Sequence, residues 1–350
     1  MLDLKALTHS IQHNCHISDA QYAGNYTMCI FLLKMREYYR WEKGIPLSHP
    51  LPRQDVGNWL TAREEYWEDL HELPFSLLSV NNKDFDPFDS ELINEQLNPQ
   101  GYVYSGGIGI FHKPYFFLGK LERNEVRNGI RLLVSSEEYA RDLVAPPAML
   151  LGDTVYIRKE SLRRIIWERI EEWRLKKQED TPMARALSCY GLKQQDDDIE
   201  TLLDQITENE LESVLLHETG EAQARMLLGP QWEELLHLLP RSKAEFVARA
   251  VRDHLADCLT TLPTFIETGN EAALHFYFAN FNGMRKEIFP EALEAYQHWI
   301  DSGNLNYLKE TCLQGQYRWQ AVAQQILDLY QARVNNLAED IETLFYPVRN

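Results

Sequence analysis

Hydrophobic and polar positions repeat with a helical period near both ends of the chain and with a strand period between them. Residues 18–43 carry apolar positions every three or four residues, with Ser18 as the predicted N-cap and Gly44 at the predicted end. The same pattern predicts helices over about 55–73 and 160–177. We therefore expect the N-terminal part to contain three long helices.

The region 101–158 has the composition of strands, because aromatic and β-branched runs alternate there with turn residues. Asn128 and Gly129 both tolerate positive φ and predict a hairpin between two of these runs. The stretch 135–144 is predicted as a short helix, since it starts with a serine followed three residues later by a glutamate. Residues 75–100, rich in Asn, Asp and Pro, are predicted to be mostly loop.

Periodicity is lost over 181–198, which predicts a linker between an α+β domain (1–180) and an all-helical domain (199–350). Two helix starts in the second domain have a capping pattern, at Thr207 and at Ser242. The predicted fold is α+β and mainly α, with N-terminal helices and a small antiparallel sheet followed by helices only.

Composition and charge narrow the class of partner. The chain of 350 residues has 35 Lys and Arg against 53 Asp and Glu, a formal charge of −18, which repels phosphate backbones and argues against a nucleic-acid partner. No apolar run reaches the length of a membrane span, and the N-terminus does not resemble a signal peptide. Five scattered cysteines without a CxxC pair favour a reducing compartment, so a cytoplasmic protein is expected, as a monomer or an oligomer.

The stretch HETGE at 217–221 begins like the zinc-protease motif H-E-x-x-H, but Glu221 replaces the second histidine. On a helical wheel Glu218 falls inside the apolar face, while His217 and Glu221 lie along its edge. A later stretch repeats this arrangement, with His254 inside the face and two aspartates at its edge. Packing the two faces together would bring six ligand-type side chains to one place.

Such a cluster needs charge compensation, and a divalent metal would supply it. The predicted ligands are His217, Glu221, Asp253 and Asp257. Glu218 or His254 would complete the coordination or move protons, and His275 is a further candidate for proton transfer. Carboxylates with imidazoles suit Mn²⁺, Fe²⁺ or Mg²⁺ better than Zn²⁺.

Two resemblances accompany these residues. The spacing of Glu218 and Glu221 resembles that of the all-helical nucleotide pyrophosphatases, whose paired acidic helices hold Mg²⁺. It covers these few positions, and His217 and His254 depart from that all-carboxylate pattern, so no activity is carried over. The stretches 17–44 and 105–114 resemble an uncharacterised bacterial family to which no activity is attached.

The sequence thus favours a metal-dependent enzyme, hydrolytic before oxidative, with a metal-bound water as nucleophile and an unidentified substrate. The alternative is a non-enzymatic interaction or scaffold protein, whose charge network is structural through pairs such as Arg225–Glu221 and Arg249–Asp253. A third possibility is an apolar ligand held among the aromatic side chains of 275–281. A buried pair between Glu37 and Arg40 is also expected, without a functional assignment.

Overall fold

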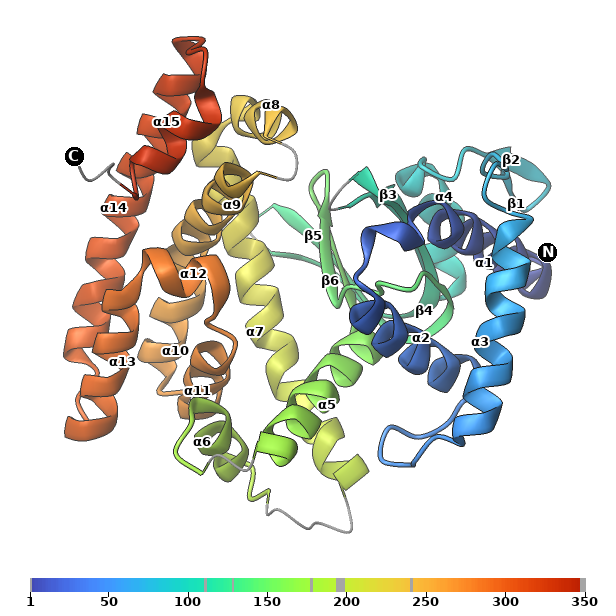
Figure 1. The fold of residues 1–350 in the computed structure, drawn as a ribbon, viewed down its shortest axis with the longest axis horizontal. Helices are drawn as coiled ribbons and strands as arrows, with labels where there is room; N and C mark the ends of the chain where they lie inside the picture. Colours follow the sequence, from blue (N-terminus) through green and yellow to red (C-terminus); the bar gives the residue numbers. More distant parts are fainter. Residues whose placement is uncertain are drawn as a thin grey trace. The chain divides into compact units, whose positions relative to one another are not determined.

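The computed structural model describes residues 2–109, 112–127, 129–176, 179–192, 199–239 and 242–346. Contacts divide the chain into two units, which we call the N-terminal unit (Met1–Glu168 and Asp198–Thr207) and the C-terminal unit (Arg169–Asp197 and Glu208–Asn350). The predicted fold class, α+β and mainly α, is confirmed (Figure 1). Within the described ranges, no helix is long and apolar enough to cross a membrane.

The helices of the N-terminal unit begin earlier in the chain than predicted. They are α1 (Leu4–Tyr22), α2 (Met28–Glu42), α3 (Arg53–Glu68), α4 (Ser90–Leu97) and the part of α5 (Lys159–Lys176) up to Glu168, with 3₁₀ turns at Ala23–Asn25 and Asn98–Gln100. The single helix predicted over 18–43 is wrong. Asp3 caps α1, and the 3₁₀ turn at Ala23–Asn25 separates α1 from α2. Ser18 lies inside α1 and donates its hydroxyl to the carbonyl of Pro114 instead of capping a helix.

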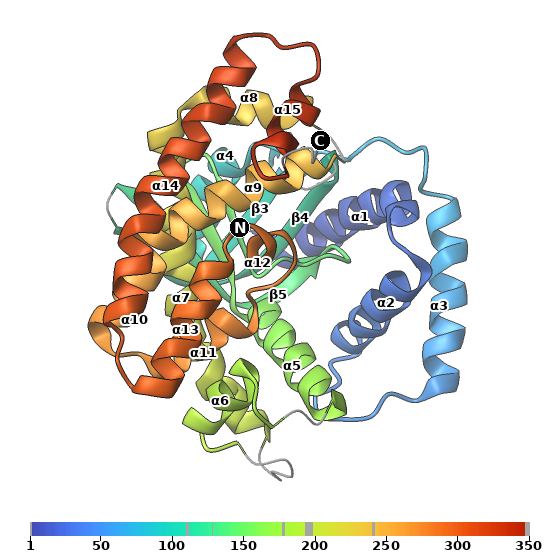
Figure 2. The ribbon, with the colours of Figure 1, turned by 60° about the vertical axis from the view of Figure 1, so that its left-hand side comes forward.

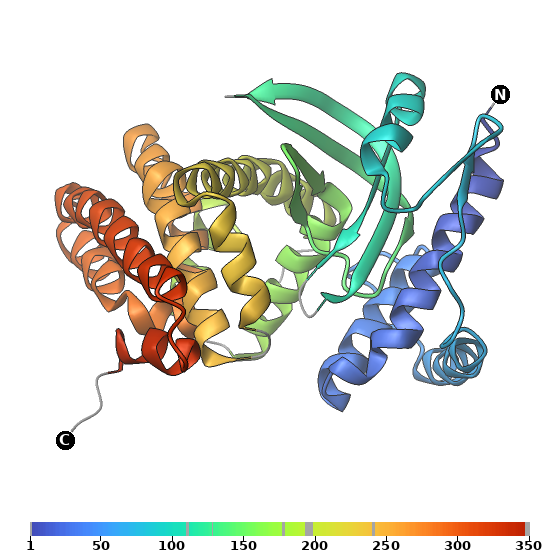
Figure 3. The same ribbon diagram turned by 90° about the horizontal axis from the view of Figure 1, so that it is seen from above.

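Five strands form the larger sheet of this unit, in the order β3-β4-β5-β7-β6. Their bounds are β3 (Tyr102–Ile108), β4 (Pro114–Arg127), β5 (Ile130–Arg141), β6 (Ala148–Leu151) and β7 (Thr154–Arg158). The hairpin predicted at Asn128 and Gly129 joins β4 to β5 with Arg127 opposite Ile130; Gly129 has φ 82°, and Asn128 lies outside the described residues. β5 and β7 run parallel, and the other neighbouring pairs are antiparallel. Viewed from above, α1 runs along one side of the long strands, which are drawn in green and teal (Figure 3).

The short helix predicted over 135–144 is wrong, since β5 continues to Arg141. Leu118 pairs with Ala140, and Phe117 pairs with Arg141, so the sheet supplies partners to a segment whose local pattern favours a helix. Tertiary pairing here overrides a local capping signal, as it often does for short segments. β5 thereby carries Glu138 and Arg141, two charged residues of the buried network described below.

Residues 75–100 contain more regular structure than the predicted loop. They form the hairpin β1 (Leu78–Val80) to β2 (Lys83–Phe85), with Asn81 and Asn82 at positive φ, and then α4. Helix α4 covers β3, which is an edge strand of the sheet. Asn94 exchanges two hydrogen bonds with the backbone of Tyr104, at 2.7 and 2.9 Å. The side chain of Asn94 thus gives the backbone of Tyr104 the hydrogen bonds that a neighbouring strand would otherwise supply.

The C-terminal unit is helical throughout its described residues. It contains α6 (Pro182–Cys189), most of α7 (Ile199–Leu228), α8 (Pro230–Leu238), α9 (Lys243–Ala256), α10 (Leu262–Thr268), α11 (Glu271–Ala279), α12 (Gly283–Ile288), α13 (Pro290–Ser302), α14 (Asn306–Gln331) and α15 (Leu337–Thr343). Helix α6 lies inside the predicted linker 181–198, of which residues 193–198 are outside the described ranges. Ser242 caps α9 as predicted. Thr207 lies within α7 and starts no helix, since its hydroxyl donates to the carbonyl of Leu203.

A π-helix, Asp257–Thr261, joins α9 to α10 and contacts α14. The long helix α14 packs along α9 and α13, as two views show (Figures 1 and 2). At Gly315 of α14, a Cβ atom would lie 2.8 Å from Cys258 Sγ and 3.1 Å from Phe289. The absence of a side chain at this glycine therefore lets α14 approach the π-helix closely.

We predict that Asn94→Ala destabilises the N-terminal unit by about 2–5 kcal/mol, because it leaves the buried N–H and C=O of Tyr104 without these partners. The exposed neighbour Glu95 supplies the control, and Glu95→Ala should change stability by no more than about 0.5 kcal/mol. Urea unfolding followed by circular dichroism measures both. Equal stability of the two variants would contradict the role assigned to α4.

Candidate functional site

The HETGE stretch lies inside α7 at the place where this helix touches the π-helix. A Cβ atom at Gly220 would lie 2.6 Å from the carbonyl oxygen of Ala256 and would also meet the hydroxyl of Thr260. That hydroxyl lies 2.9 Å from the carbonyl oxygen of Leu216 on α7. Glycine at this position thus permits backbone-to-backbone approach of the two elements. Gly220, the glycine of the HETGE stretch, therefore has a packing role.

Asp257, at the start of the π-helix, is the most deeply buried acid of the predicted cluster, with 1% of its surface exposed. It accepts hydrogen bonds from His217 Nδ1 at 2.8 Å and from the Tyr277 hydroxyl at 3.0 Å, and it forms an ion pair with Arg285. Burial alone would raise its pKa, but Arg285 and His217 outweigh burial and lower the pKa to about 2. Asp257 is therefore ionised and its oxygens are already occupied.

A second ion pair lies beside it. Arg252 donates to Glu221 at 2.9 Å and to Asp253 at 3.3 Å. Burial opposes ionisation of Glu221, yet Arg252 and then His217 hold the pKa of Glu221 well below its ordinary value. For Asp253 burial dominates and raises the pKa. Arg252 and Arg285 thus supply two cations of the cluster, where the sequence had suggested Arg225 and Arg249.

His217 joins the two ion pairs, with Nδ1 facing Asp257 and Nε2 lying 3.5 Å from Glu221 Oε1. Burial would lower its pKa, but Asp257 and Glu221 raise the pKa well above 6.5, although 28% of the side chain is exposed. The raised pKa favours the imidazolium form of His217, in which both ring nitrogens carry protons.

Glu218 lies in the apolar face of α7 and is buried, as the helical wheel indicated. Burial first, and then the neighbouring Glu221, raise the pKa of Glu218 to about 8. At neutral pH Glu218 is therefore protonated. At most three carboxylates of the cluster are ionised, and they face the three cations His217, Arg252 and Arg285. Charges of both signs thus face each other within the cluster.

The other two predicted histidines have aromatic surroundings. His254 is fully buried, stacks on Trp319 at a centroid distance of 4.8 Å, and hydrogen-bonds through Nε2 to the carbonyl of Arg285 at 3.0 Å. Burial and then Arg285 lower its pKa to about 3. His275 stacks on Trp299 and contacts the hydroxyl of Tyr296 at 2.9 Å. The structure thus brings His217, Glu221, Asp253 and Asp257 together and gives His275 separate partners.

A metal would have to compete with these protein donors. Within the described ranges, no group of three or more His, Cys, Asp or Glu side chains lies together in a geometry that could hold a metal ion. A pocket of about 620 Å³ in this unit is lined by residues of α8, α14 and the segment leading to α15, and by none of the cluster residues. The ligand set and its ion stay predictions.

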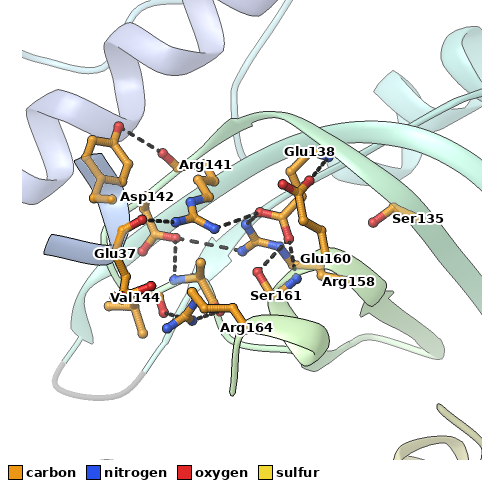
Figure 4. Close-up of polar contacts among 12 residues, drawn as sticks. Glu37, Ser135, Glu138, Arg141, Asp142, Val144, Arg158, Glu160, Ser161 and Arg164 are labelled. Atoms are coloured by element: carbon orange, nitrogen blue, oxygen red, sulfur yellow. Dashed lines mark hydrogen bonds and ion pairs between the residues drawn. The ribbon is translucent and has the colours of Figure 1, made fainter. Parts of the chain in front are cut away.

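The N-terminal unit contains a second buried charge network that the sequence revealed only in part (Figure 4). Arg158 of β7 is fully buried, pairs with Glu138, and lies 3.8 Å from Asp142. Lys113 lies 2.8 Å from Asp142 and 2.9 Å from Asp19. The network therefore joins charges from α1, β5, β7 and the segment before β4.

The pKa of each carboxyl group in this network depends on its burial and on the charges that face it. Burial opposes ionisation of Glu138, but Arg158 and then Arg141 lower its pKa. Burial likewise opposes ionisation of Asp142, whose pKa Lys113 lowers. Asp19 differs, because burial dominates and raises its pKa to about 6. The predicted pair of Glu37 and Arg40 is confirmed at 3.2 Å and lies in α2 of the same unit.

Glu138 of this network also lines a pocket of about 590 Å³ within the N-terminal unit. The pocket is lined by Gln12 of α1, Trp41 and Glu42 of α2, residues 137–139 of β5 and Glu160 of α5. Three consecutive residues of a regular strand cannot line one pocket, because successive side chains point to opposite faces. Here the pairing with β4 skips Tyr139, since Ala140 lies opposite Leu118 and Glu138 opposite Gly119. A second irregularity follows, since Ser135 lies opposite Leu121, so the strand alternation is interrupted along 136–139 and neighbouring residues can line the same pocket.

Sequence reasoning missed this pocket for an identifiable reason. Its β5 residues fall in the segment predicted as a helix, and its ion pairs join residues far apart in the chain, such as Lys113 and Asp19. The available signals were the charged, strand-compatible run 137–142 and the buried pair in α2.

We predict opposite effects for two glycine-to-alanine changes in helices. Gly220→Ala should destabilise the chain by about 1–3 kcal/mol, because its Cβ would overlap the backbone of Ala256, the last residue of α9, and the Thr260 hydroxyl of the π-helix. Gly57→Ala in α3 meets nothing within 4 Å and should stabilise it by about 0.5–1 kcal/mol through helix propensity. Thermal unfolding of both variants measures the effects. Stabilisation by Gly220→Ala would show that α7 and the π-helix are not in close contact.

A pH series tests the protonation of Glu218. Its pKa of about 8 in the folded chain exceeds the ordinary 4.5, so the folded state holds this proton more tightly than the unfolded state. The resulting stability is complete below about pH 4.5 and is lost as the pH rises to about 8. Glu218→Gln should remove this decline, whereas Glu267→Gln, at an exposed position of α10, should retain it. Melting temperatures between pH 5 and 8.5 provide the comparison, and parallel curves for all three proteins would contradict it.

Comparison with known proteins gives a family without an assigned activity. The chain matches no curated protein and no solved structure. Two matches cover most of its length, one at residues 6–158 with the N-terminal domain and one at residues 163–347 with the C-terminal domain of a single family. The chain therefore belongs to the family described as a family of unknown function (DUF6866).

Proposed function

We propose that this chain is a non-enzymatic binding protein and that the charge cluster of its C-terminal unit is structural. The observation that supports this proposal most directly is the set of partners around Asp257. A histidine, a tyrosine and an arginine from α7, α11 and α12 all donate to this one buried carboxylate. Asp257 thereby fixes the positions of three helices around the π-helix.

Charge balance supports the same conclusion. A site for a divalent cation normally presents unpaired carboxylate oxygens and neutral imidazoles. Here the imidazole of His217 is protonated, and Arg252 and Arg285 already neutralise the acids. A buried network of this kind can specify helix packing, because any other register leaves a charge without a partner.

A metal-dependent hydrolase is the second candidate, and Glu218 is the observation that favours it. A buried carboxyl with a pKa of about 8, beside ionised groups, is typical of a residue that transfers protons in catalysis. In this case His217, Glu221, Asp253 and Asp257 would hold Mn²⁺, Fe²⁺ or Mg²⁺, and Glu218, His254 or His275 would move protons. The ion would first have to displace both arginines and deprotonate His217.

Substitution of Asp257 distinguishes the two candidates. If the cluster is structural, Asp257→Asn leaves Arg285 without its charge partner and His217 with Glu221 alone, and it should destabilise the metal-free protein by about 3–5 kcal/mol. Glu221→Gln should act in the same direction but less strongly, since Arg252 retains Asp253. Melting curves of the metal-stripped proteins, with Glu267→Gln as the control, give the result.

Melting curves of the same proteins recorded with added Mn²⁺ or Mg²⁺ test the metal-dependent hydrolase directly. A structural cluster predicts no metal-dependent rise in the melting temperature of the wild-type protein. A metal site predicts that rise, its loss in both variants, and unchanged or higher stability of the variants without metal, because removal of a carboxylate relieves repulsion. This second pattern would overturn the structural assignment.

A further inference from the structure

Helix α1 carries three histidines on one side, His9, His13 and His16. Residues four apart in an α-helix lie one above the other, with Cβ atoms about 5–6 Å apart. Two histidines with this spacing can chelate one metal ion, as the histidines of an H-E-x-x-H helix do. His9 is exposed and His13 is half-buried, so solvent reaches both imidazoles. These two residues are therefore spaced and placed as a pair of metal ligands.

The third histidine of α1 is not available to such an ion. His16 is buried, and Nη1 of Arg63 lies 3.0 Å from its Nε2 and 3.1 Å from its Nδ1. The indole nitrogen of Trp67 lies 3.3 Å from Nδ1 as well. Within the described ranges, no group of three or more potential ligands has a geometry that could hold a metal ion. A metal on α1 would thus have two protein ligands and take water at its other positions.

The surroundings of His9 and His13 favour the neutral imidazole that a metal needs. In the described part of the chain, neither residue forms an ion pair with Asp or Glu. Burial first, and then His9, lower the pKa of His13 below 6.5, so its ring is mostly neutral at pH 7. His13 Nδ1 lies 3.3 Å from the hydroxyl of Tyr66 on α3. A metal-binding histidine commonly uses its second nitrogen for such a hydrogen bond, which leaves Nε2 for the ion.

The kind of donor selects the kind of ion. Imidazole suits Cu²⁺, Ni²⁺ and Zn²⁺, whereas Mg²⁺ and Ca²⁺ prefer oxygen ligands. Two metal–nitrogen bonds of about 2 Å bring the two nitrogens to about 3 Å from each other, within reach of imidazoles one helical turn apart. We propose that His9 and His13 together bind one divalent ion of this class at the surface of α1, Cu²⁺ most tightly. This inference goes beyond the proposed function and does not involve the C-terminal cluster.

The test is titration of the full-length chain with Cu²⁺ at pH 7, with glycine as a weak competing chelator. Cys29→Ser and Cys189→Ser form the background for all proteins, because exposed thiols also bind Cu²⁺. We expect one bound Cu²⁺ and at least tenfold weaker binding after His9→Gln or His13→Gln, since chelation needs both rings. His71→Gln removes an exposed histidine outside α1 and should leave the affinity unchanged. Circular dichroism of the metal-free variants confirms that α1 stays folded.

Electron paramagnetic resonance of the bound Cu²⁺ identifies its ligands. Nitrogen hyperfine structure should show two imidazole nitrogens in the background protein and fewer in either single variant of α1. A signal from oxygen ligands alone would overturn the inference. So would unchanged affinity in both α1 variants, or a loss in His71→Gln as large as theirs.

Ionic strength and competing ions separate chelation from attraction to an acidic surface. The formal charge of −18 attracts any cation, but salt screens such attraction. Binding through imidazole should persist in about 0.3 M KCl and in the presence of excess Mg²⁺. Displacement of Cu²⁺ by either would contradict the proposed site. None of these outcomes changes the melting curves that test the C-terminal cluster, so the two proposals fail separately.

Discussion

The pairing of Asp257 with its cationic partners is the interaction on which the C-terminal unit depends. An ionised carboxylate removed from water is costly unless opposite charge and hydrogen bonds replace the lost solvent. Asp257 is almost fully buried, and its partners come from three different helices. Satisfying this one carboxylate therefore fixes the relative positions of α7, α11 and α12 around the π-helix.

Two glycines make that arrangement sterically possible. Gly220 on α7 and Gly315 on α14 both lie against the segment Ala256–Thr260, where a side chain at either position would overlap existing atoms. A π-helix widens the backbone turn locally and often occurs where a helix carries a functional or strained residue. In this protein it presents Asp257 to the cations and receives two close helix contacts. The HETGE stretch contributes His217 to the charge pairing and Gly220 to the approach.

The N-terminal unit applies the same constraint with a different outcome. Its interior charges, such as Arg158 with Glu138 and Lys113 with Asp142, are paired. At the pocket, irregular pairing with β4 interrupts the strand alternation along residues 137–139, and Glu160 of α5 lines the pocket with them. Glu42 and Glu138 have cationic partners there, whereas Glu160 accepts the backbone N–H of Glu138.

The sequence by itself determined the type of most elements, because local periodicity and capping chemistry depend on neighbouring residues. The strand runs between 101 and 158, the hairpin at Gly129, the cap at Ser242, the buried position of Glu218 and the fold class follow from such patterns. The family resemblance was also visible in the stretches 17–44 and 105–114.

Only the tertiary structure decided where β5 ends, which cations neutralise the acids, and which carboxylates are protonated. β5 extends to Arg141 because β4 supplies pairing partners that no local pattern reveals. Asp257 meets His217 and Arg285 across 40 and 28 residues of chain. Glu218 and Glu221 differ in pKa although they lie one helical turn apart, because one is buried in the apolar face and the other meets Arg252. Burial and long-range contact set these charges, and both arise only when the chain folds.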